Sequence, residues 1–148
     1  MFKRILCPVD FDSDSLGALR VACNLAIREQ GTIQVLHVTQ PLDPTVISAP
    51  WIAQRNEENA WRELRQIEDK DLGMVEHEIM LRSGDPAKEI MKAAEEVAAE
   101  LIVMATHGRT GFRHVVLGSV TEHVVRESSC PVLTIRMGTS PCMDRENK

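Results

Sequence analysis

The chain has 148 residues, of which 43% are hydrophobic and 26% charged, and its formal net charge is −5. This length and composition are typical of one globular domain and exclude a collagen-like, disordered or disulfide-scaffold protein. The negative charge argues against nonspecific binding to nucleic acid or to an anionic membrane, because both require a cationic protein surface. Any anionic ligand must therefore be held by a local site.

The cysteines and the apolar runs favour a cytoplasmic protein. Cys7, Cys23, Cys130 and Cys142 form no CxxC pair and have no histidine at metal-ligand spacing, so we expect buried or free thiols rather than zinc or redox chemistry. The apolar runs are far shorter than the ~20 residues of a membrane helix, and residues 1–10 lack a signal-peptide core. We therefore expect no disulfide and no membrane partner.

The first part of the chain predicts two strands that flank a helix. Residues 2–9 are typical of a buried strand, and polar residues between 12 and 15 supply N-cap candidates for the helix that follows. Gly31 is predicted to end that helix. The β-branched stretch 32–38 then predicts the second strand.

A loop with three prolines separates the second strand from the next helix. These prolines, the last of which is Pro50, exclude regular structure over about a dozen residues, and a loop of that length often has a function. The charge-rich stretch 51–70 has apolar residues at helical spacing, so it predicts a helix. Residues 75–81 alternate in polarity, as in a strand with one wetter face.

The rest of the chain continues the alternation of helices and strands. Residues 84–86 supply a glycine turn, an aspartate N-cap and a first-turn proline for a helix. The apolar run 101–105 predicts a central parallel strand that is covered on both faces. Residues 119–126 and 131–136 are predicted to form the last helix and the fifth strand.

This alternation predicts an α/β fold, a single open parallel sheet with right-handed crossovers and helices on both faces. Residues 1–137 would form this one domain, and residues 138–148 a flexible C-terminal tail. Open parallel sheets bind ligands beyond the carboxyl ends of their strands, at the point where the winding reverses. We therefore expect a site after the first and fourth strands.

A glycine-punctuated loop follows the predicted fourth strand. Gly108, Gly111 and Gly118 lie between Ala105 and Ser119. Glycine allows sharp turns and lets backbone amides approach a phosphate without obstruction by a Cβ, and Gly118 stands where a helix N-terminus would present free N–H groups. The loop therefore predicts an anion-binding cradle.

Two interpretations of this loop are open. His107 and Arg109, with further basic residues up to position 114, add positive charge to an acidic chain, as a polyphosphate site requires. Alternatively, the glycines only shape a surface loop, and Ser119 forms a capping box with Glu122. The two are compatible, since an N-cap serine can also face a bound phosphate.

Asp10, at the carboxyl end of the first predicted strand, also has two interpretations. Its carboxylate could accept a hydrogen bond from a ribose hydroxyl at the point where the winding reverses. It could instead belong to the helix-start cluster with Asp12 and Ser13.

Other nucleotide-binding and catalytic motifs are missing from the sequence. Residues 8–11 stand where a G-x-G-x-x-G motif would follow the first strand, and no P-loop lysine occurs between Lys92 and Lys148. No nucleophile with an adjacent base is evident, and His37 and His77 are expected to be satisfied in or beside strands. We therefore predict no catalytic residue and no metal-ligating side chain.

Four short segments form a recognisable set. They are residues 5–10, residues 84–86, the pair Gly118-Ser119 and residues 130–132. Together they resemble the universal stress protein family along nearly the whole chain. The most specific part is similar to the family's ATP pattern of glycine, two residues, glycine, nine residues, glycine, and serine or threonine. Gly108, Gly118 and Ser119 match this pattern, and Ala105 replaces its first glycine.

The resemblance implies a Rossmann-like sheet of the adenine nucleotide alpha hydrolase type, with strand order 3-2-1-4-5. It implies that ATP, with Mg2+ or Mn2+, lies with its adenosine near Asp10 and the backbone of Val38. The phosphates would lie near the glycine loop and the start of the last helix. The implied cofactor-binding residues are Pro8, Val9, Asp10, Val38, Ala105, His107, Gly108, Arg109, Gly111, Gly118, Ser119, Val120 and Thr121.

The last strand predicts a homodimer. Its apolar stretch between Val132 and Ile135 would end the sheet with an unpaired edge, and the resemblance implies pairing through that edge. The leading functional hypothesis is a stress-response or regulatory protein that binds ATP. A slow ATPase or phosphotransferase is the second, and a nucleotide-free dimeric interaction module, which Ala105 favours, is the third.

Overall fold

The computed structural model describes residues 1–43, 45, 50–107 and 117–137. In chain order the elements are β1 (Arg4–Pro8), α1 (Ser13–Glu29), β2 (Thr32–Thr39), α2 (Pro50–Ile67), the π-helix η1 (Glu68–Leu72), β3 (Glu76–Ser83), α3 (Pro86–Glu96), β4 (Leu101–Ala105), α4 (Ser119–Glu127) and β5 (Val132–Ile135). In this part of the chain, no helix combines the length and the apolar character needed to cross a membrane.

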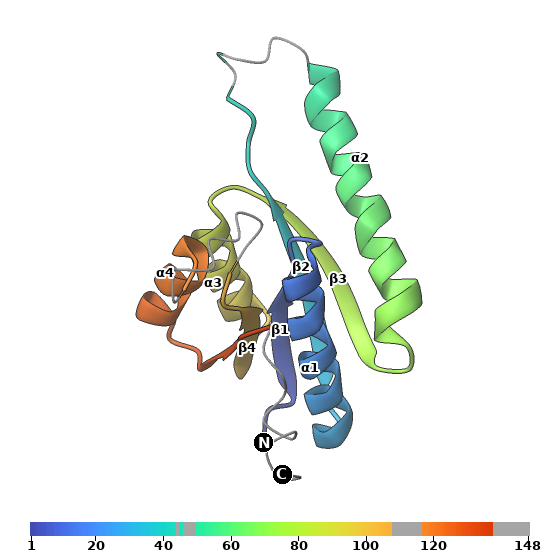
Figure 1. Cartoon of the computed structure of the whole chain (residues 1–148), viewed down its shortest axis with the longest axis vertical. Helices are drawn as coiled ribbons and strands as arrows, with labels where there is room; N and C mark the ends of the chain where they lie inside the picture. The colour runs from blue at the N-terminus through green and yellow to red at the C-terminus, as the bar shows by residue number, and fades with distance from the viewer. Residues whose placement is uncertain (44, 46–49, 108–116, 138–148) are drawn as a thin grey trace, which may run out of the picture.

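The five strands form one parallel sheet in the order β3-β2-β1-β4-β5 (Figure 1). Cys7 of β1 lies opposite Val35 of β2, and Leu6 lies opposite Ile102 of β4. The predicted α/β fold and strand order are therefore confirmed. The winding reverses between β1 and β4, so a crevice is expected at their carboxyl ends.

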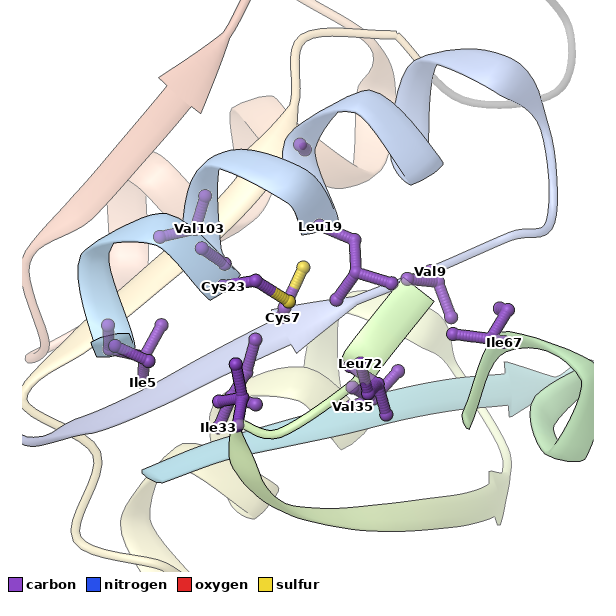
Figure 2. Packing of buried hydrophobic residues seen from close by; sticks show 14 of the residues in the cluster. Ile5, Cys7, Val9, Leu19, Cys23, Ile33, Val35, Ile67, Leu72 and Val103 are labelled. Carbon is purple, nitrogen blue, oxygen red and sulfur yellow. The ribbon is translucent and has the colours of Figure 1, made fainter. Parts of the chain in front are cut away.

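The two faces of the sheet are covered by different helices. α1 and α2 pack on one face, where Cys7 and Val35 lie among the buried side chains shown in Figure 2. α3 and α4 pack on the other, against Leu6 and Leu36. All residues of β4 are buried, which confirms the central strand predicted from its apolar run.

The end of α1 differs from the prediction. The left-handed residue at its C-terminus is Gln30, with φ of 51°, and not Gly31. Gly31 serves another purpose, because a Cβ there would lie 2.4 Å from the backbone oxygen of Lys3. The glycine is therefore required by the close approach of the chain to β1, and the turn itself is made by glutamine.

The boundaries of α2 also differ from the prediction. Pro50 is the first residue of the helix and not part of the loop, because a helix has no acceptor for the N–H that proline lacks there. The α-helix ends at Ile67 and one π-helical turn follows. His77 of β3 holds this turn in place, since its Nε2 lies 3.0 Å from Glu68 Oε1 and its Nδ1 lies 2.7 Å from Val75 O.

The first half of α2 extends past the sheet in Figure 1, and the side chain of Trp51 there is 62% exposed.

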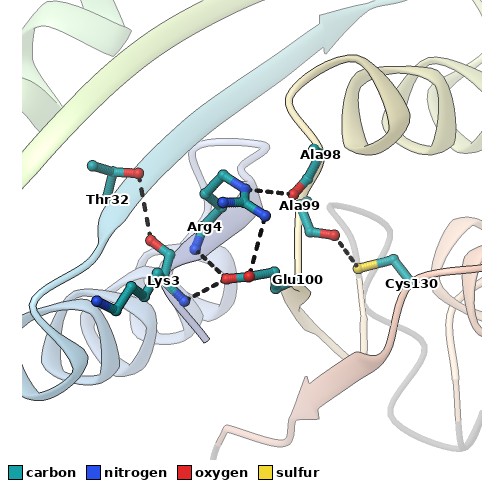
Figure 3. Close-up of polar contacts among 7 residues, drawn as sticks. All are labelled: Lys3, Arg4, Thr32, Ala98, Ala99, Glu100 and Cys130. Carbon is teal, nitrogen blue, oxygen red and sulfur yellow. Dashed lines mark hydrogen bonds and ion pairs between the residues drawn. The ribbon is translucent and has the colours of Figure 1, made fainter. Parts of the chain in front are cut away.

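Glu100 ties the amino ends of β1 and β4 together (Figure 3). Its carboxylate accepts hydrogen bonds from the backbone N–H of Lys3 at 2.6 Å, the backbone N–H of Arg4 at 3.0 Å and the Arg4 guanidinium at 3.1 Å. The N–H groups of Arg4 and Lys3 hold the pKa of Glu100 below its ordinary value of 4.5.

Glu100→Gln is expected to lower the free energy of unfolding at pH 7. In acid the substitution should have a much smaller effect on this free energy. The folded-state pKa is depressed, so the contribution of the carboxylate is present above the ordinary pKa of 4.5 and is lost as the pH falls through the folded-state value. Urea denaturation of both proteins at pH 7 and at about pH 3 measures this. If the urea midpoints of the wild type and of Glu100→Gln differ by the same amount at both pH values, the charged carboxylate is not the source of the stabilisation.

Candidate functional site

A pocket of about 680 Å³ opens at the carboxyl ends of β1, β2 and β4, where the winding of the sheet reverses. This volume is typical of a small-molecule site. Each predicted site residue that the structure describes lines it, namely Pro8, Val9, Asp10, Val38, Ala105, His107, Gly118, Ser119, Val120 and Thr121. Gly108, Arg109 and Gly111 lie outside the described residues.

The N-terminus of α4 forms one wall of the pocket. Gly118 is its N-cap, with φ of −66° and ψ of 161°, and its N–H donates to Thr106 O at 2.6 Å. The amides of the first helical turn, from Ser119 to Thr121, have no acceptor within the helix and carry the positive end of its dipole. This arrangement suits a bound anion.

The predicted capping box of Ser119 and Glu122 is wrong. Ser119 is already the first helical residue, and Gly118 occupies the cap position. The backbone N–H of Glu122 bonds to Gly118 O at 2.9 Å, and the side chain of Glu122 pairs with Arg126. Ser119 is thus left on the pocket wall.

Thr121 and Ala105 join α4 to the end of β4. The buried hydroxyl of Thr121 donates to Ala105 O at 2.9 Å. Ala105 is part of β4 and does not have a positive φ, unlike the non-glycine residues Phe11, Gln30 and Ala98. Alanine therefore introduces no backbone strain at the position where the family pattern has glycine.

Asp10 belongs to the start of α1, which confirms its place in the helix-start cluster, and it also lines the pocket. Its backbone N–H donates to Ser15 Oγ at 3.2 Å, and its Oδ1 accepts from the N–H of Asp12 at 3.3 Å. Asp12 is the N-cap of α1 and accepts from the N–H of Ser15 at 2.8 Å. Burial, together with Asp10, raises the pKa of Asp12 above its ordinary value.

Sequence reasoning missed several pocket residues, among them two groups. Phe11 and His37 line the pocket together, with ring centroids 4.2 Å apart. Asn56, Asn59 and Glu63 of α2 also line it. The spacing of these three residues places them on one face of α2. The sequence could not show that this face lies over the carboxyl end of the sheet.

The pocket lining combines polar and apolar groups. The first turn of α4, the acidic residues Asp10 and Glu63, and apolar residues of the strand ends all line it. Across the described ranges, no group of three or more His, Cys, Asp or Glu side chains is placed to hold a metal ion.

Comparison with known proteins identifies the family. The sequence model of the universal stress protein family matches residues 1–136. The chain belongs to the universal stress protein family. Universal stress protein MJ0531 of Methanocaldococcus jannaschii is 32% identical over 142 residues, which are 92% of this chain and 83% of that protein. Universal stress protein YxiE of Bacillus subtilis is 30% identical over 148 residues, which cover 92% of this chain and 100% of that protein.

Solved structures of universal stress proteins share the fold. Protein MJ0577 of M. jannaschii superposes with a TM-score of 0.83 at 30% identity, over 95% of this chain and 99% of that one. A universal stress protein crystallised in complex with cAMP has a TM-score of 0.71 at 22% identity, over 93% and 98%. A family member from Arabidopsis thaliana with AMP bound has a TM-score of 0.67 at 19% identity, over 95% and 96%.

Proposed function

We propose that this universal stress protein binds ATP in the pocket at the switch point and acts as a stress-response or regulatory protein. The observation that carries the proposal is the first turn of α4, which forms one wall of a pocket whose lining also includes Asp10. A helix N-terminus suits phosphate, and a carboxylate suits the hydroxyls of a ribose. The complexes of other family members with cAMP and with AMP support an adenine nucleotide as the ligand.

The pocket residues divide by chemistry. The phosphates are assigned to the N–H groups of Ser119, Val120 and Thr121 beside Gly118, together with the loop residues His107, Gly108, Arg109 and Gly111. The adenosine is assigned to Asp10 and to the backbone of Val38, with Pro8, Val9 and Ala105 forming the surface beneath it. A Mg2+ or Mn2+ ion would be held chiefly by phosphate oxygens, as is usual where few carboxylates are present.

Nucleotide that co-purifies with the protein tests the proposal most directly. The absorbance spectrum and chromatography of the denatured protein's supernatant identify a bound adenine nucleotide. Calorimetric titration with ATP, with and without Mg2+, then measures affinity. Absence of any adenine nucleotide binding would favour the nucleotide-free interaction module, and sustained phosphate release from ATP would favour the ATPase.

We also propose that the protein works in the cytoplasm without a nucleic acid or membrane partner. The cysteines that the structure describes, Cys7, Cys23 and Cys130, are free thiols, as expected in a reducing compartment. Burial raises the pKa of each of the three, which favours the protonated thiol. The net charge of −5 disfavours an anionic polymer or surface.

We propose a homodimer through β5. This strand pairs only with β4 among the described strands, so its other edge offers backbone groups to a second chain. Leu133 of β5 is 37% exposed, and Met137 beyond the strand is 40% exposed. These two apolar side chains lie on or directly after β5 and would be covered in a dimer.

Thr134→Pro is expected to convert the dimer to a folded monomer. Pro131 O accepts from Ile102 of β4, and Ile135 O accepts from Thr106 directly after β4. In the parallel pattern the N–H of Thr134 therefore points away from β4 toward the open edge. Proline there removes an outward donor and leaves the inner ladder intact. Sedimentation at micromolar concentration measures the change, and Thr134→Val, which keeps the N–H, is the matched control. A wild-type protein that sediments only as a monomer would rule the dimer out.

A further inference from the structure

Phe11 has an unusual backbone conformation at the edge of the pocket. Its φ of 68° lies in the left-handed region, which side chains other than glycine rarely adopt. It lies between Asp10 and Asp12, whose side chains make the turn into α1. Such a conformation persists only where the surrounding structure holds it, and it often marks a functional site.

The ring of Phe11 is held in a defined place. It packs against the buried cluster beneath α1, and its centroid lies 4.2 Å from that of His37 with the planes at 33°. His37 is itself anchored, since its Nδ1 lies 2.7 Å from Val9 O. The aromatic pair therefore joins the ends of β1 and β2 along one wall of the pocket.

Two cavities adjoin at Phe11. Phe11, Asn59 and Glu63 line both the 680 Å³ pocket and a second groove of about 470 Å³ between α1 and α2. Leu16 and Ile67 line the second groove but not the pocket. Among the three shared residues Phe11 is the aromatic one and is partly buried, whereas Asn59 and Glu63 are exposed. Its ring is thus the packed part of this shared lining, which we call the partition.

We propose that Phe11 determines the size of base that the nucleotide pocket accepts, because its ring closes the pocket toward the α1–α2 groove. This inference rests on the proposed nucleotide binding at the same site. The left-handed backbone at Phe11 aims the ring into the partition, and His37 supports it from β2. Removal of the ring joins the groove to the pocket, so a base that carries a bulky substituent gains room.

The test compares ATP with ATP derivatives that carry a benzyl group on N6 or on C8, by calorimetric titration. Phe11→Gly removes the ring at a backbone position that glycine adopts readily, and Phe11→Ala is the second variant. We expect the wild type to prefer ATP over both derivatives at least about tenfold, and the variants to reduce that preference at least about tenfold for one of them. Leu16→Ala, which enlarges the groove alone, is expected to keep the wild-type preference.

The ratio of the affinity for ATP to that for each derivative distinguishes a change in specificity from a loss of stability. A loss of structure would weaken the binding of all three ligands together. Circular dichroism and thermal melting establish which of the two variants is folded, and the ratio is measured on that one. The same ratio in the wild type and in the folded variant would overturn the proposal while ATP binding stands. A wild type that binds no adenine nucleotide would overturn both this proposal and the proposed function.

Discussion

Gly118→Val is expected to abolish ATP binding while the domain remains folded. Gly118 lines the pocket at the entrance to α4, so a branched side chain there would occupy the space assigned to the phosphates and obstruct the amides that follow. Each hydrogen bond to a charged group contributes roughly 1.5–3 kcal/mol, so the loss of two weakens binding on the order of 100-fold or more. Calorimetric titration with Mg-ATP measures the change.

The structure explains why the fold should survive this substitution. The φ of −66° and ψ of 161° at Gly118 are open to any residue, and valine keeps the N–H that bonds to Thr106 O. Valine is a poorer N-cap than glycine, so a stability loss of about 1 kcal/mol is expected. Gly118→Ala, with a smaller side chain, should fall between wild type and Gly118→Val in affinity. If folded Gly118→Val binds ATP as tightly as the wild type, the phosphates do not lie at this helix.

Asp10→Ala is expected to weaken ATP binding by roughly 1.5–3 kcal/mol, or about 10- to 150-fold, because one hydrogen bond to a charged group is lost. The residue lies at the carboxyl end of β1 and lines the same pocket as the positive end of α4. Titration with ATP, with adenosine and with inorganic triphosphate locates the effect. The loss should appear with ATP and adenosine and be small with triphosphate.

Asp10 also has a local role, which requires a matched control. Its Oδ1 accepts a hydrogen bond from the N–H of Asp12 at the start of α1. Asp10→Asn keeps that acceptor but removes the charge, so it should retain the stability of the wild type and lose only part of the affinity for adenosine. Equal ATP affinity in the wild type and in folded Asp10→Ala would exclude Asp10 from the nucleoside site.

The structure clarifies the one departure from the family's ATP pattern. Ala105 lies in the extended backbone of β4, and its carbonyl accepts the Thr121 hydroxyl. A methyl group in this conformation carries no strain. Backbone strain at Ala105 therefore gives no reason to expect a nucleotide-free module.

Local physical chemistry allowed much of the fold to be predicted. The apolar run of β4 indicates a strand buried on both faces, and Asp85 caps α3 before Pro86, as the residue types require. The glycine spacing, read with its resemblance to a known family, located the pocket wall at Gly118 and Ser119. The cap of α3 joins residues close in sequence, and the burial of β4 follows from its apolar composition, so in both cases the sequence pattern carries the information.

Long-range packing decided what the sequence could not show. Gly31 is required by the passing backbone of Lys3, Phe11 is held in a left-handed conformation beside His37 of another strand, and the polar face of α2 reaches the pocket. None of these contacts has a local signal, because each joins segments that only the sheet order brings together. The sequence by itself determined the elements, the family and one wall of the site, and the tertiary structure decided the opposite wall, because that wall is made by side chains from separate elements.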